Sequence, residues 1–477
     1  MSTQTFAAAQ ASQSPVRAAR HEHMYSRYPR TNVDKKAIMD MVEEYNVQFV
    51  DFQFTDLDGV LKAITLPIHK IGDAIDHDVW FDGSSIKGFT TITESDMVLR
   101  PDLNTFAILP WTLAEEDVTA RLICDVYMPD GTPYEGDPRQ ILKRQLEEAK
   151  KLGLNFNVGP ELEFFLFKTD EAGKATVIPH DSAGYFDQTT DDALQIRRHM
   201  AFDLDMMGIE VERMHHEVAE GQHEINFRYA DALRTADNAI SMKLTLKAKA
   251  KELGLHCSFM PKPIFGVNGS GMHVHESLES ITDGTNKFYD EAGTYGLSAL
   301  AQSFIAGQLL HIRAMNAVMN PTVNSYKRLV VGYEAPVNAA WGQRNRSALI
   351  RIPRLTPATA ATATRIELRC PDPSCNPYLA FAVMLAAGLD GIKQGLSAPA
   401  PVEQNIWDLT PKQMKKMGIK TVAGNLKEAL DELEKDEVIR SALGEDTFQK
   451  FYDAKLAEWE EYRSNVSAWE TAKYLDC

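Results

Sequence analysis

Apolar and polar residues alternate in short runs over the first third of the chain. The apolar positions within 49–54, followed by turn residues up to Gly59, predict a β-hairpin. Further strand-like runs lie at 106–109 and 122–126, and a Pro-Asp-Gly turn follows them. The pattern therefore predicts a small β-rich domain that ends near residue 135.

At Asp137-Pro138 the pattern changes to longer helical segments separated by strand-like runs. Asp is a favoured N-cap and Pro fits the first helical turn, so this pair predicts the start of a helix. Strands and helices mixed in this way indicate an α+β protein. The expected helices cover 139–152, 191–207, 231–253, 296–319, 377–392, 426–433 and 444–466, and the expected strands cover 157–167, 224–228, 272–275 and 365–368.

The first 32 residues differ from the rest of the chain. They are rich in Ala, Ser, Gln and Arg and contain a single acid, Glu22. We expect residues 1–32 to form a flexible N-terminal extension, and a transit peptide, which has a similar composition, is the alternative. The remaining chain divides into a β-rich domain at 33–135 and a larger domain at 136–477.

Composition and charge narrow the class of protein. The chain has 477 residues, of which 44% are apolar and 25% charged, values typical of a globular enzyme rather than a disordered or fibrous protein. A net charge of −17 opposes non-specific binding to nucleic acid or to an anionic membrane. The longest apolar stretch, 379–389, is too short to span a bilayer. Five cysteines, an odd number, favour a reduced compartment, and we expect a cytoplasmic protein.

Two carboxylates stand two residues apart in the apolar run 160–167. Because side chains alternate along a strand, Glu161 and Glu163 point to the same face. An acid pair in so apolar a strand is costly to bury unless a positive group lies opposite. A solvent-facing pair would be the simpler reading, but the run favours a metal site.

The segment 215–224 concentrates three imidazoles and three carboxylates in ten residues. Gly221 interrupts any helix there, so Glu217 and Glu224 are expected to flank a turn and to converge on one ion. Oxygen ligands of this kind are typical of Mg²⁺ or Mn²⁺. Each of these side chains taken alone would be an ordinary surface residue.

A glycine-rich turn precedes a His-x-His strand at 268–275. Glycines permit close approach of the backbone to a ligand, and both imidazoles share one face of the strand. The pattern favours one metal ligand and one contact to phosphate or substrate among His273 and His275, although a lone His would by default be a core residue.

Arginines recur in the last third of the chain, at Arg328, over 344–351 and at 365–369. In an acidic protein such clustering indicates an anionic substrate, because a guanidinium binds carboxylate and phosphate oxygens through two hydrogen bonds. Carboxylates of the magnesium type together with arginines predict phosphoryl transfer from a nucleotide. A phosphate-binding loop of the G-x-x-x-x-G-K-[ST] type does not occur in the sequence.

Taken together, the motifs resemble type I glutamine synthetase from about residue 33 to the C-terminus. The resemblance implies an N-terminal β-grasp domain, a catalytic domain with a curved antiparallel sheet and surrounding helices, and a dodecamer of two hexameric rings with active sites shared between subunits. The matching motifs are Phe81-Asp82-Gly83-Ser84-Ser85-Ile86, Glu94-Ser95-Asp96-Met97, 160–167, 215–224, Asn268-Gly269-Ser270-Gly271-Met272-His273, Gly332-Tyr333-Glu334-Ala335-Pro336 and the arginine runs.

The resemblance also implies roles for individual residues. The first metal would be held by Glu163, Glu217 and Glu224, and the second by Glu161, His273 and Glu367. Residues that contact the substrates, glutamate and ATP, are implied as well: Asn268, Gly269, Arg328, Glu334, Arg346 and Arg369 for glutamate, and Glu212, His275, Ser277, Arg346 and Arg351 for ATP. Two or more Mg²⁺ or Mn²⁺ ions per site are implied.

The implied reaction is the ATP-dependent ligation of ammonia to glutamate. The γ-carboxylate attacks the γ-phosphate of ATP, and ammonia displaces phosphate from the resulting γ-glutamyl phosphate. Asp82, from the neighbouring subunit, and Asp96 would bind and deprotonate ammonium, Glu334 would exclude water, and Arg346 would stabilise the transferring phosphoryl group. A γ-glutamyl-amine ligase and a relative without activity are the alternatives; Asp82 and Glu334 disfavour the first, and the complete set of metal ligands disfavours the second.

Two positions place the chain closer to the branch of the family that is not adenylylated. Trp407 stands where the adenylylated branch has a tyrosine, and an indole has no hydroxyl to accept a nucleotidyl group. Glu217 and Glu224 are seven residues apart, as in the branch that is not adenylylated. That branch usually has an arginine where this chain has Thr91, so we expect weak feedback inhibition by glutamine unless a neighbour such as Lys87 supplies the charge.

Overall fold

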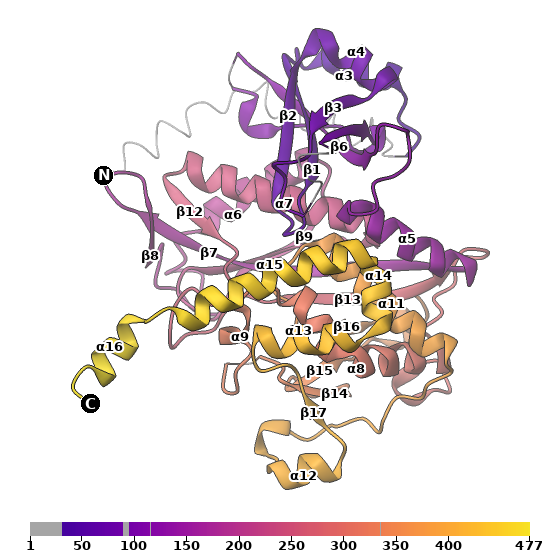
Figure 1. Ribbon diagram of the computed structural model, residues 1–477, viewed down its shortest axis with the longest axis vertical. Helices are drawn as coiled ribbons and strands as arrows, with labels where there is room; N and C mark the ends of the chain where they lie inside the picture. Colours follow the sequence, from indigo (N-terminus) through magenta and orange to yellow (C-terminus); the bar gives the residue numbers. More distant parts are fainter. Residues whose placement is uncertain (1–30, 89–94, 115, 334) are drawn as a thin grey trace.

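A computed structural model describes residues 31–88, 95–114, 116–333 and 335–477. The described chain forms a small β-rich part and a larger part built on a long sheet. Helix α15 (Glu445–Ser464) lies across the larger part, and the last helix, α16 (Ala468–Tyr474), extends away from it (Figure 1). The extension predicted at 1–32 lies outside the described residues except for its last two, and so do Thr91, Glu94 and Glu334.

The small part is a sheet with the strand order β2-β1-β6-β4-β3. The predicted hairpin is confirmed, since β1 (Phe49–Thr55) pairs antiparallel with β2 (Leu61–Pro67). β1 also pairs parallel with β6 (Thr119–Tyr127), and the remaining pairs are antiparallel. The other elements are α3 (Lys35–Glu44), α4 (Ile71–His77), β3 (Val79–Asp82), β4 (Asp96–Pro101) and β5 (Ala107–Ile108).

The larger part contains a sheet with the order β17-β14-β15-β16-β13-β7-β10-β9. Its central strand is β7 (Leu154–Thr169), which carries the acid pair and also binds three short strands. The sheet strands are β8 (Ala175–Pro179), β9 (Val211–His216), β10 (Gln222–Phe227), β11 (Ala230–Asp231), β12 (Leu255–Ser258), β13 (Met272–Ser280), β14 (Asn338–Gly342), β15 (Ala348–Arg351), β16 (Ile366–Leu368) and β17 (Lys420–Thr421).

One strand pair departs from the expected antiparallel arrangement, because β14 and β15 run parallel. The link between Gly342 and Ala348 spans up to about 20 Å when extended. This length is enough for the chain to run back from the end of β14 to its beginning, because β14 has only five residues. A short link can therefore join parallel neighbours here, and the sequence pattern alone does not reveal it.

Most of the long helices begin and end within three residues of their predicted bounds. They are α5 (Pro138–Lys151), α6 (Leu194–Met206), α7 (Ala232–Glu252), α8 (Ala299–Met319), α11 (Pro377–Lys393), α13 (Leu426–Lys435) and α15 (Glu445–Ser464). Short helices were not predicted: α9 (Ser325–Arg328), α10 (Pro357–Ala363), α12 (Pro411–Lys416), α14 (Glu437–Leu443) and α16 (Ala468–Tyr474). Helices of one or two turns leave too little periodicity to be recognised.

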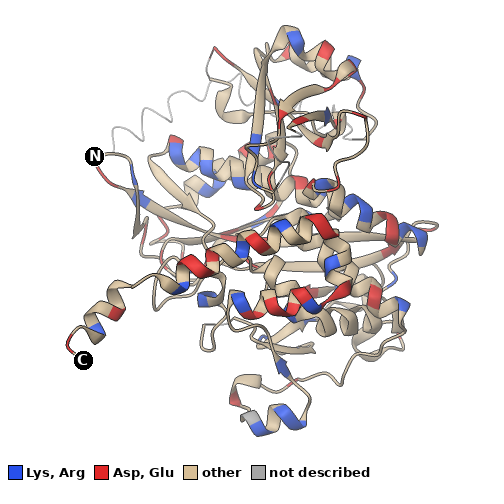
Figure 2. Cartoon of the chain, in the orientation of Figure 1, with Lys and Arg blue, Asp and Glu red and all other residues tan. Residues whose placement is uncertain are grey.

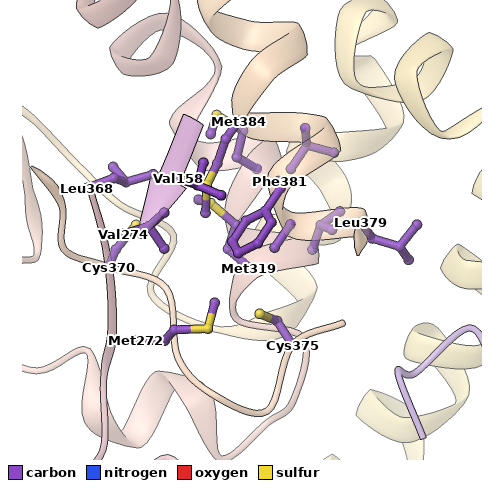
Figure 3. Close-up of a cluster of buried hydrophobic side chains, with 14 of the residues drawn as sticks. Val158, Met272, Val274, Met319, Leu368, Cys370, Cys375, Leu379, Phe381 and Met384 are labelled. Atoms are coloured by element: carbon purple, nitrogen blue, oxygen red, sulfur yellow. The ribbon is translucent and has the colours of Figure 1, made fainter. Parts of the chain in front are cut away.

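Helices α8 and α11 cross closely over the sheet. A Cβ at Gly307 would lie 2.1 Å from the carbonyl oxygen of Ala387, and a Cβ at Gly391 would lie 2.1 Å from that of Ser303. Between these helices and the sheet lies a core that includes Val274 from β13 and Phe381 from α11 (Figure 3). These helices thus cover one face of the sheet, and the predicted metal ligands of its strands lie on the other.

None of the helices in the described part of the chain has both the length and the hydropathy needed to cross a membrane.

Arg139, at the start of α5, joins the two parts of the chain. The residue is 2% exposed, and its guanidinium lies 2.8 Å from Asp102 and 2.7 Å from Asp125, both in the small part. On its other side it lies 2.9 Å from Asp237 of α7. Tyr378 of α11 donates a hydrogen bond of 2.6 Å to Asp237. One buried cation therefore compensates three carboxylates from different elements.

Replacement of Arg139 by methionine is expected to lower the stability of the protein by about 3–5 kcal/mol, because Asp102, Asp125 and Asp237 lose their shared partner. Thermal and urea denaturation of the assembled protein measure the change. Lys150→Met on the exposed face of the same helix is the matched control, and its loss is expected to stay within about 0.5 kcal/mol. Equal losses in both variants would contradict the role assigned to Arg139.

Candidate active site

Strand register brings the residues of the second predicted metal group together. Glu161 on β7 lies directly opposite His273 on β13, and His275 on β13 lies opposite Glu367 on β16. His273 Nδ1 is 3.6 Å from Glu161 Oε2 and 3.8 Å from Glu367 Oε1. Glu161, His273 and Glu367 each offer a ligand atom within 4.8 Å of the others. The three residues are referred to below as the Glu161 cluster.

The carboxylates of this cluster are held in the ionised form. Burial opposes ionisation of Glu161, but hydrogen bonds from His273 and His275 outweigh it and keep the pKa well below the usual range. Burial likewise disfavours the charge on Glu367, whereas the nearby imidazoles and guanidinium groups lower its pKa. Burial also lowers the pKa of His273, which favours the neutral imidazole that can bind a metal.

A second cluster forms where β9 turns into β10. Glu224 lies opposite Glu163 of β7 on one side and opposite His215 of β9 on the other. His215 Nδ1 is 3.4 Å from Glu217 Oε1, and its Nε2 is 3.3 Å from Glu224 Oε1. We call His215, Glu217, Glu224 and the adjacent Glu163 the Glu217 cluster. His215 was not among the predicted ligands, although it stands two residues before Glu217 and so shares its face.

The chemistry of this donor set fits a divalent cation. Burial and the charges of Glu217 and Glu224 together raise the pKa of Glu163 well above its usual value. Glu163 Oε2 already accepts hydrogen bonds from Gln222 Nε2 and the Gly271 amide, each at 2.9 Å. Three carboxylates crowded around one imidazole repel each other unless a cation joins them, and hard oxygen ligands are those that Mg²⁺ and Mn²⁺ prefer.

The glycine-rich turn packs against two buried arginines. Arg328 donates to the carbonyl oxygens of Cys370 at 2.8 Å and Arg369 at 3.2 Å. A Cβ at Gly271 would lie 2.4 Å from Arg328 Nη2, so any larger residue there would displace this guanidinium. Arg369 donates to the carbonyl oxygen of Arg346, and its Nε lies 3.2 Å from Glu367 Oε1. These contacts place cationic groups next to the Glu161 cluster.

A cavity of about 1660 Å³ opens beside the Glu161 cluster. Glu212, His275 and Ser277, three of the four residues expected to contact only ATP, line it. The fourth, Arg351, lines an adjoining cavity of about 690 Å³ and lies 2.5 Å from Glu367. Glu161 and His275 line both cavities, so the two spaces meet at the Glu161 cluster.

The smaller cavity is rich in arginine. Besides Arg351 it is lined by Arg213, Arg344, Arg354 and Arg365. Arg344 and Arg365 belong to the arginine runs seen in the sequence, but no role was assigned to any of these four. Arg213 adjoins Glu212 on β9, and its Nη2 lies 3.8 Å from Glu161 Oε1. Clustered guanidinium groups beside carboxylates that fit a cation suit a polyphosphate.

Other predicted residues lie apart from these clusters. Arg346 is exposed and lines neither cavity. Asn268 and Gly269 lie in the turn before β13, and the Gly269 carbonyl accepts a hydrogen bond of 3.1 Å from Gln222. Asp82, at the end of β3 in the small part, is exposed and accepts a hydrogen bond of 2.8 Å from the Ser84 amide. Lys87, considered as a substitute for the missing arginine near Thr91, pairs with Asp58 at 2.5 Å.

One buried carboxyl lies on the opposite face of β13. Glu276 is 0% exposed, and Gln308 of α8 donates a hydrogen bond of 2.6 Å to its Oε2. Burial raises the pKa of Glu276 to about 8. Neither Glu276 Oε1 nor Gln308 Oε1 has a hydrogen-bond partner among the described residues. A single proton on Glu276 satisfies both oxygens, which indicates a neutral acid–amide pair at neutral pH.

This proton predicts a pH-dependent stability. In the folded protein Glu276 keeps its proton up to a pKa of about 8, whereas in the unfolded chain the carboxyl has its ordinary pKa of about 4.5 and releases the proton there. The contribution of Glu276 is therefore complete below pH 4.5 and falls by at most about 1.4 kcal/mol per pH unit until pH 8. Glu276→Gln keeps the amide pairing and removes this slope. Denaturation of both proteins from pH 5 to pH 8 tests it, and parallel curves would contradict the assignment.

The chain is similar to glutamine synthetases along most of its length. The family model described as "Glutamine synthetase, catalytic domain" matches residues 135–474, and the model for the β-grasp domain matches 46–129. A glutamine synthetase of Clostridium saccharobutylicum is 53% identical over 443 residues, which cover 93% of this chain and 98% of the relative. One from Thermus thermophilus is 53% identical over 446 residues, covering 92% and 98%.

A solved structure titled "GmaS/ADP complex-Conformation 1" is similar in three dimensions. It matches with a TM-score of 0.83 and 33% identity, covering 92% of this chain and 99% of that one. Together with the family models, this match confirms the predicted order of a β-grasp domain followed by a catalytic domain with a curved sheet. The predicted boundaries at residues 33 and 135 stay predictions.

Proposed function

Because the chain belongs to the glutamine synthetase family, we propose that it ligates ammonia to the γ-carboxylate of L-glutamate at the expense of ATP, giving L-glutamine, ADP and phosphate. The observation that supports this most strongly is the pair of carboxylate and imidazole clusters on one sheet face, beside a large cavity and an arginine-lined one. A metal-dependent enzyme that transfers a phosphoryl group needs this combination.

The two clusters are proposed to hold Mg²⁺ or Mn²⁺. Glu163, Glu217 and Glu224 would hold one ion, with His215 beside it, and Glu161, His273 and Glu367 would hold another. When bound, such ions neutralise the charge on phosphate oxygens. The protein itself fixes the ligands: Gln222 and the Gly271 amide orient Glu163, and His275 orients Glu161.

ATP is proposed to lie in the larger cavity with its phosphates toward the arginines. Glu212, His275 and Ser277 would contact the nucleotide, and Arg351 would contact its phosphates. Arg346, which lines neither cavity, is added to the phosphate contacts on the family resemblance alone. Arg344, Arg354 and Arg365 add positive charge in the same direction. The γ-phosphate would then meet the glutamate carboxylate between the two clusters, where Arg346 would stabilise the phosphoryl group in transfer.

Glutamate is proposed to bind near the glycine-rich turn through Asn268, Gly269, Arg328, Arg346 and Arg369. A carboxylate is a poor acyl donor, so an oxygen of the γ-carboxylate first attacks the γ-phosphorus of ATP. The bond from this phosphorus to the oxygen that bridges to the β-phosphate breaks, ADP leaves, and γ-glutamyl phosphate forms. The nitrogen lone pair of ammonia then attacks the acyl carbon, and the bond to the phosphate oxygen breaks. Glu334, which lies outside the described residues, would exclude water from this intermediate.

The remaining acid, Asp82, is proposed to act across a subunit boundary. It lies exposed at the end of β3, and no described contact joins it to either cluster of its own chain. In a dodecamer of two hexameric rings, Asp82 of one subunit would bind ammonium in the site of its neighbour and accept a proton from it. That step yields the uncharged ammonia that can attack the acyl phosphate.

A ligase that joins glutamate to an organic amine is the second candidate. It would use the same clusters and cavities and differ only in the acceptor pocket. Asp82 favours ammonium, because a carboxylate at the pocket binds a small cation and takes its proton.

Phosphate release from ATP with a panel of acceptors tests the proposed function. With glutamate and Mg²⁺ or Mn²⁺ present, ammonium is expected to support turnover at least about 10²-fold more efficiently than methylamine, ethylamine or putrescine. Mass spectrometry of the product identifies glutamine. Preferred use of an amine would overturn the proposal in favour of the second candidate, and phosphate release without glutamate would overturn both.

A further inference from the structure

A buried polar network lies on the side of β9 and β10 away from the Glu217 cluster. Asp181, His216 and His223 each offer a ligand atom within 4.8 Å of the others, and all three are buried. Arg197 of α6 also contacts this network. Its Nη1 lies 2.9 Å from His223 Nδ1 and 3.0 Å from Asp191 Oδ1. The residues alternate along the strands with Glu217 and Glu224 and so occupy the opposite face.

The hydrogen bonds of His223 argue against an ion at this place. Arg197 can only donate, so His223 Nδ1 must accept and the ring proton of the neutral imidazole sits on Nε2. That nitrogen then has no lone pair for a metal. Charge points the same way, because Arg197 already pairs with Asp191. Both ring nitrogens of His216 likewise face oxygen acceptors, Asp181 Oδ1 and the Glu217 carbonyl, so neither has a lone pair for a cation.

Asp181 joins both ends of the turn that carries Glu217. Its Oδ1 lies 3.0 Å from His216 Nε2, before the turn, and 3.0 Å from the Gly221 amide, after it. His216 Nδ1 in turn lies 2.7 Å from the carbonyl oxygen of Glu217. Gly221 has a φ of +67°, and a Cβ there would meet the Leu166 carbonyl at 2.9 Å, so this turn requires glycine at 221.

The same turn leads into the ligands on the other face. The Glu217 amide donates to the Gln222 carbonyl at 2.8 Å, and the Gln222 side chain donates to Glu163. A displacement of the turn would move Glu217 and Gln222 together, and with them the geometry of the Glu217 cluster. No other described carboxylate bridges the two ends of this turn.

We propose that Asp181 is a positioning residue, which fixes the 217–221 turn from behind the sheet and thereby sets the affinity of the Glu217 cluster for its metal ion. The proposal rests on the proposed function, in that Glu163, Glu217 and Glu224 hold an ion. Asp181 itself touches neither the ion nor a substrate; it acts through His216 and the Gly221 amide.

Titration of the assembled protein with Mn²⁺, followed by the EPR signal of free Mn²⁺, tests the proposal. Asp181→Ala removes both hydrogen bonds and is expected to weaken one class of Mn²⁺ site by about 10–100-fold and leave the other unchanged. Asp181→Asn keeps an oxygen at Oδ1 and is expected to stay within about threefold of the wild type. Asp192→Ala, which removes an exposed carboxylate next to Asp191 in the sequence, is the control and should leave the Mn²⁺ affinity of both classes of site unchanged.

Three outcomes would overturn the proposal. If Asp181→Ala lowers the melting temperature but leaves Mn²⁺ affinity unchanged, the residue serves stability alone. If the wild type binds an additional ion that Asp181→Asn loses, the network is itself an ion site. Glu217→Gln separates this proposal from the proposed function: if that variant also binds Mn²⁺ normally, the metal assignment is at fault.

Discussion

Replacement of Glu367 by glutamine is expected to lower ATP-dependent turnover by about 10³-fold or more while the protein keeps its assembly. Glu367 is 2% exposed, and its carboxylate faces His273, Arg351 and Arg369. Glutamine preserves its shape but removes the charge, so an ion in the Glu161 cluster loses a ligand. The developing charge on the phosphoryl group is then left without compensation.

Phosphate release at saturating ATP and glutamate measures the loss, and size-exclusion chromatography with light scattering checks assembly. Glu171→Gln, an exposed acid in the hairpin between β7 and β8, is the matched control and should retain full activity. Near-normal turnover by a correctly assembled Glu367→Gln protein would show that this residue holds no metal that matters to the reaction.

Mixed oligomers of two inactive variants are expected to recover activity. Asp82→Ala leaves both metal clusters intact, and Glu367→Ala leaves Asp82 intact, so a site between two such subunits contains every group. Random assembly of equal amounts gives about a quarter of the wild-type number of sites, because each site needs one subunit of each kind in a fixed order. Co-expression with two affinity tags yields verified mixed rings.

The double variant Asp82→Ala/Glu367→Ala, mixed with Asp82→Ala, is the control and is expected to stay inactive. Mixed rings of the single variants that also stay inactive would contradict a site shared between subunits. In that case the acid that binds ammonium would have to come from the same chain as the metal clusters.

The fold could be predicted where local pattern and packing agree. The hairpin at Gly59 and the helix after Asp137 follow from turn chemistry and capping, and the structure confirms both. The parallel pairing of β14 with β15 could not be predicted, because it depends on contacts between segments and not on local sequence. The C-terminal region shows the same limit. Helices α13 and α15, which carry many charged residues (Figure 2), were predicted, whereas α14 between them has only seven residues and was missed.

From residue patterns alone, the site could be predicted only as separate pairs, and the grouping of these pairs into two ligand sets came from the family resemblance. Glu161 with Glu163, and His273 with His275, follow from the two-residue period of a strand. Which pairs face each other depends on register, and only the structure shows that Glu161 lies opposite His273 and Glu163 opposite Glu224.

Residues without a local pattern were missed for the same reason. Arg213 is the one arginine of β9, so no run of arginines marks it in the sequence. It lines the arginine-rich cavity because β9 lies close to Glu161 and to the segment after β15. Asp181 gave no signal in the sequence either. Its proposed role depends on its hydrogen bonds to His216 and to the Gly221 amide, which lie far from it in the sequence.

The transfer of oxygen from glutamate to phosphate tests the central claim most directly. Glutamate labelled with ¹⁸O in the γ-carboxylate is incubated with ATP, ammonium and Mg²⁺, and the phosphate released is analysed by mass spectrometry. If the carboxylate attacks the γ-phosphate and ammonia then displaces phosphate, each phosphate carries one ¹⁸O for each glutamine formed. Unlabelled phosphate formed together with glutamine would contradict the account.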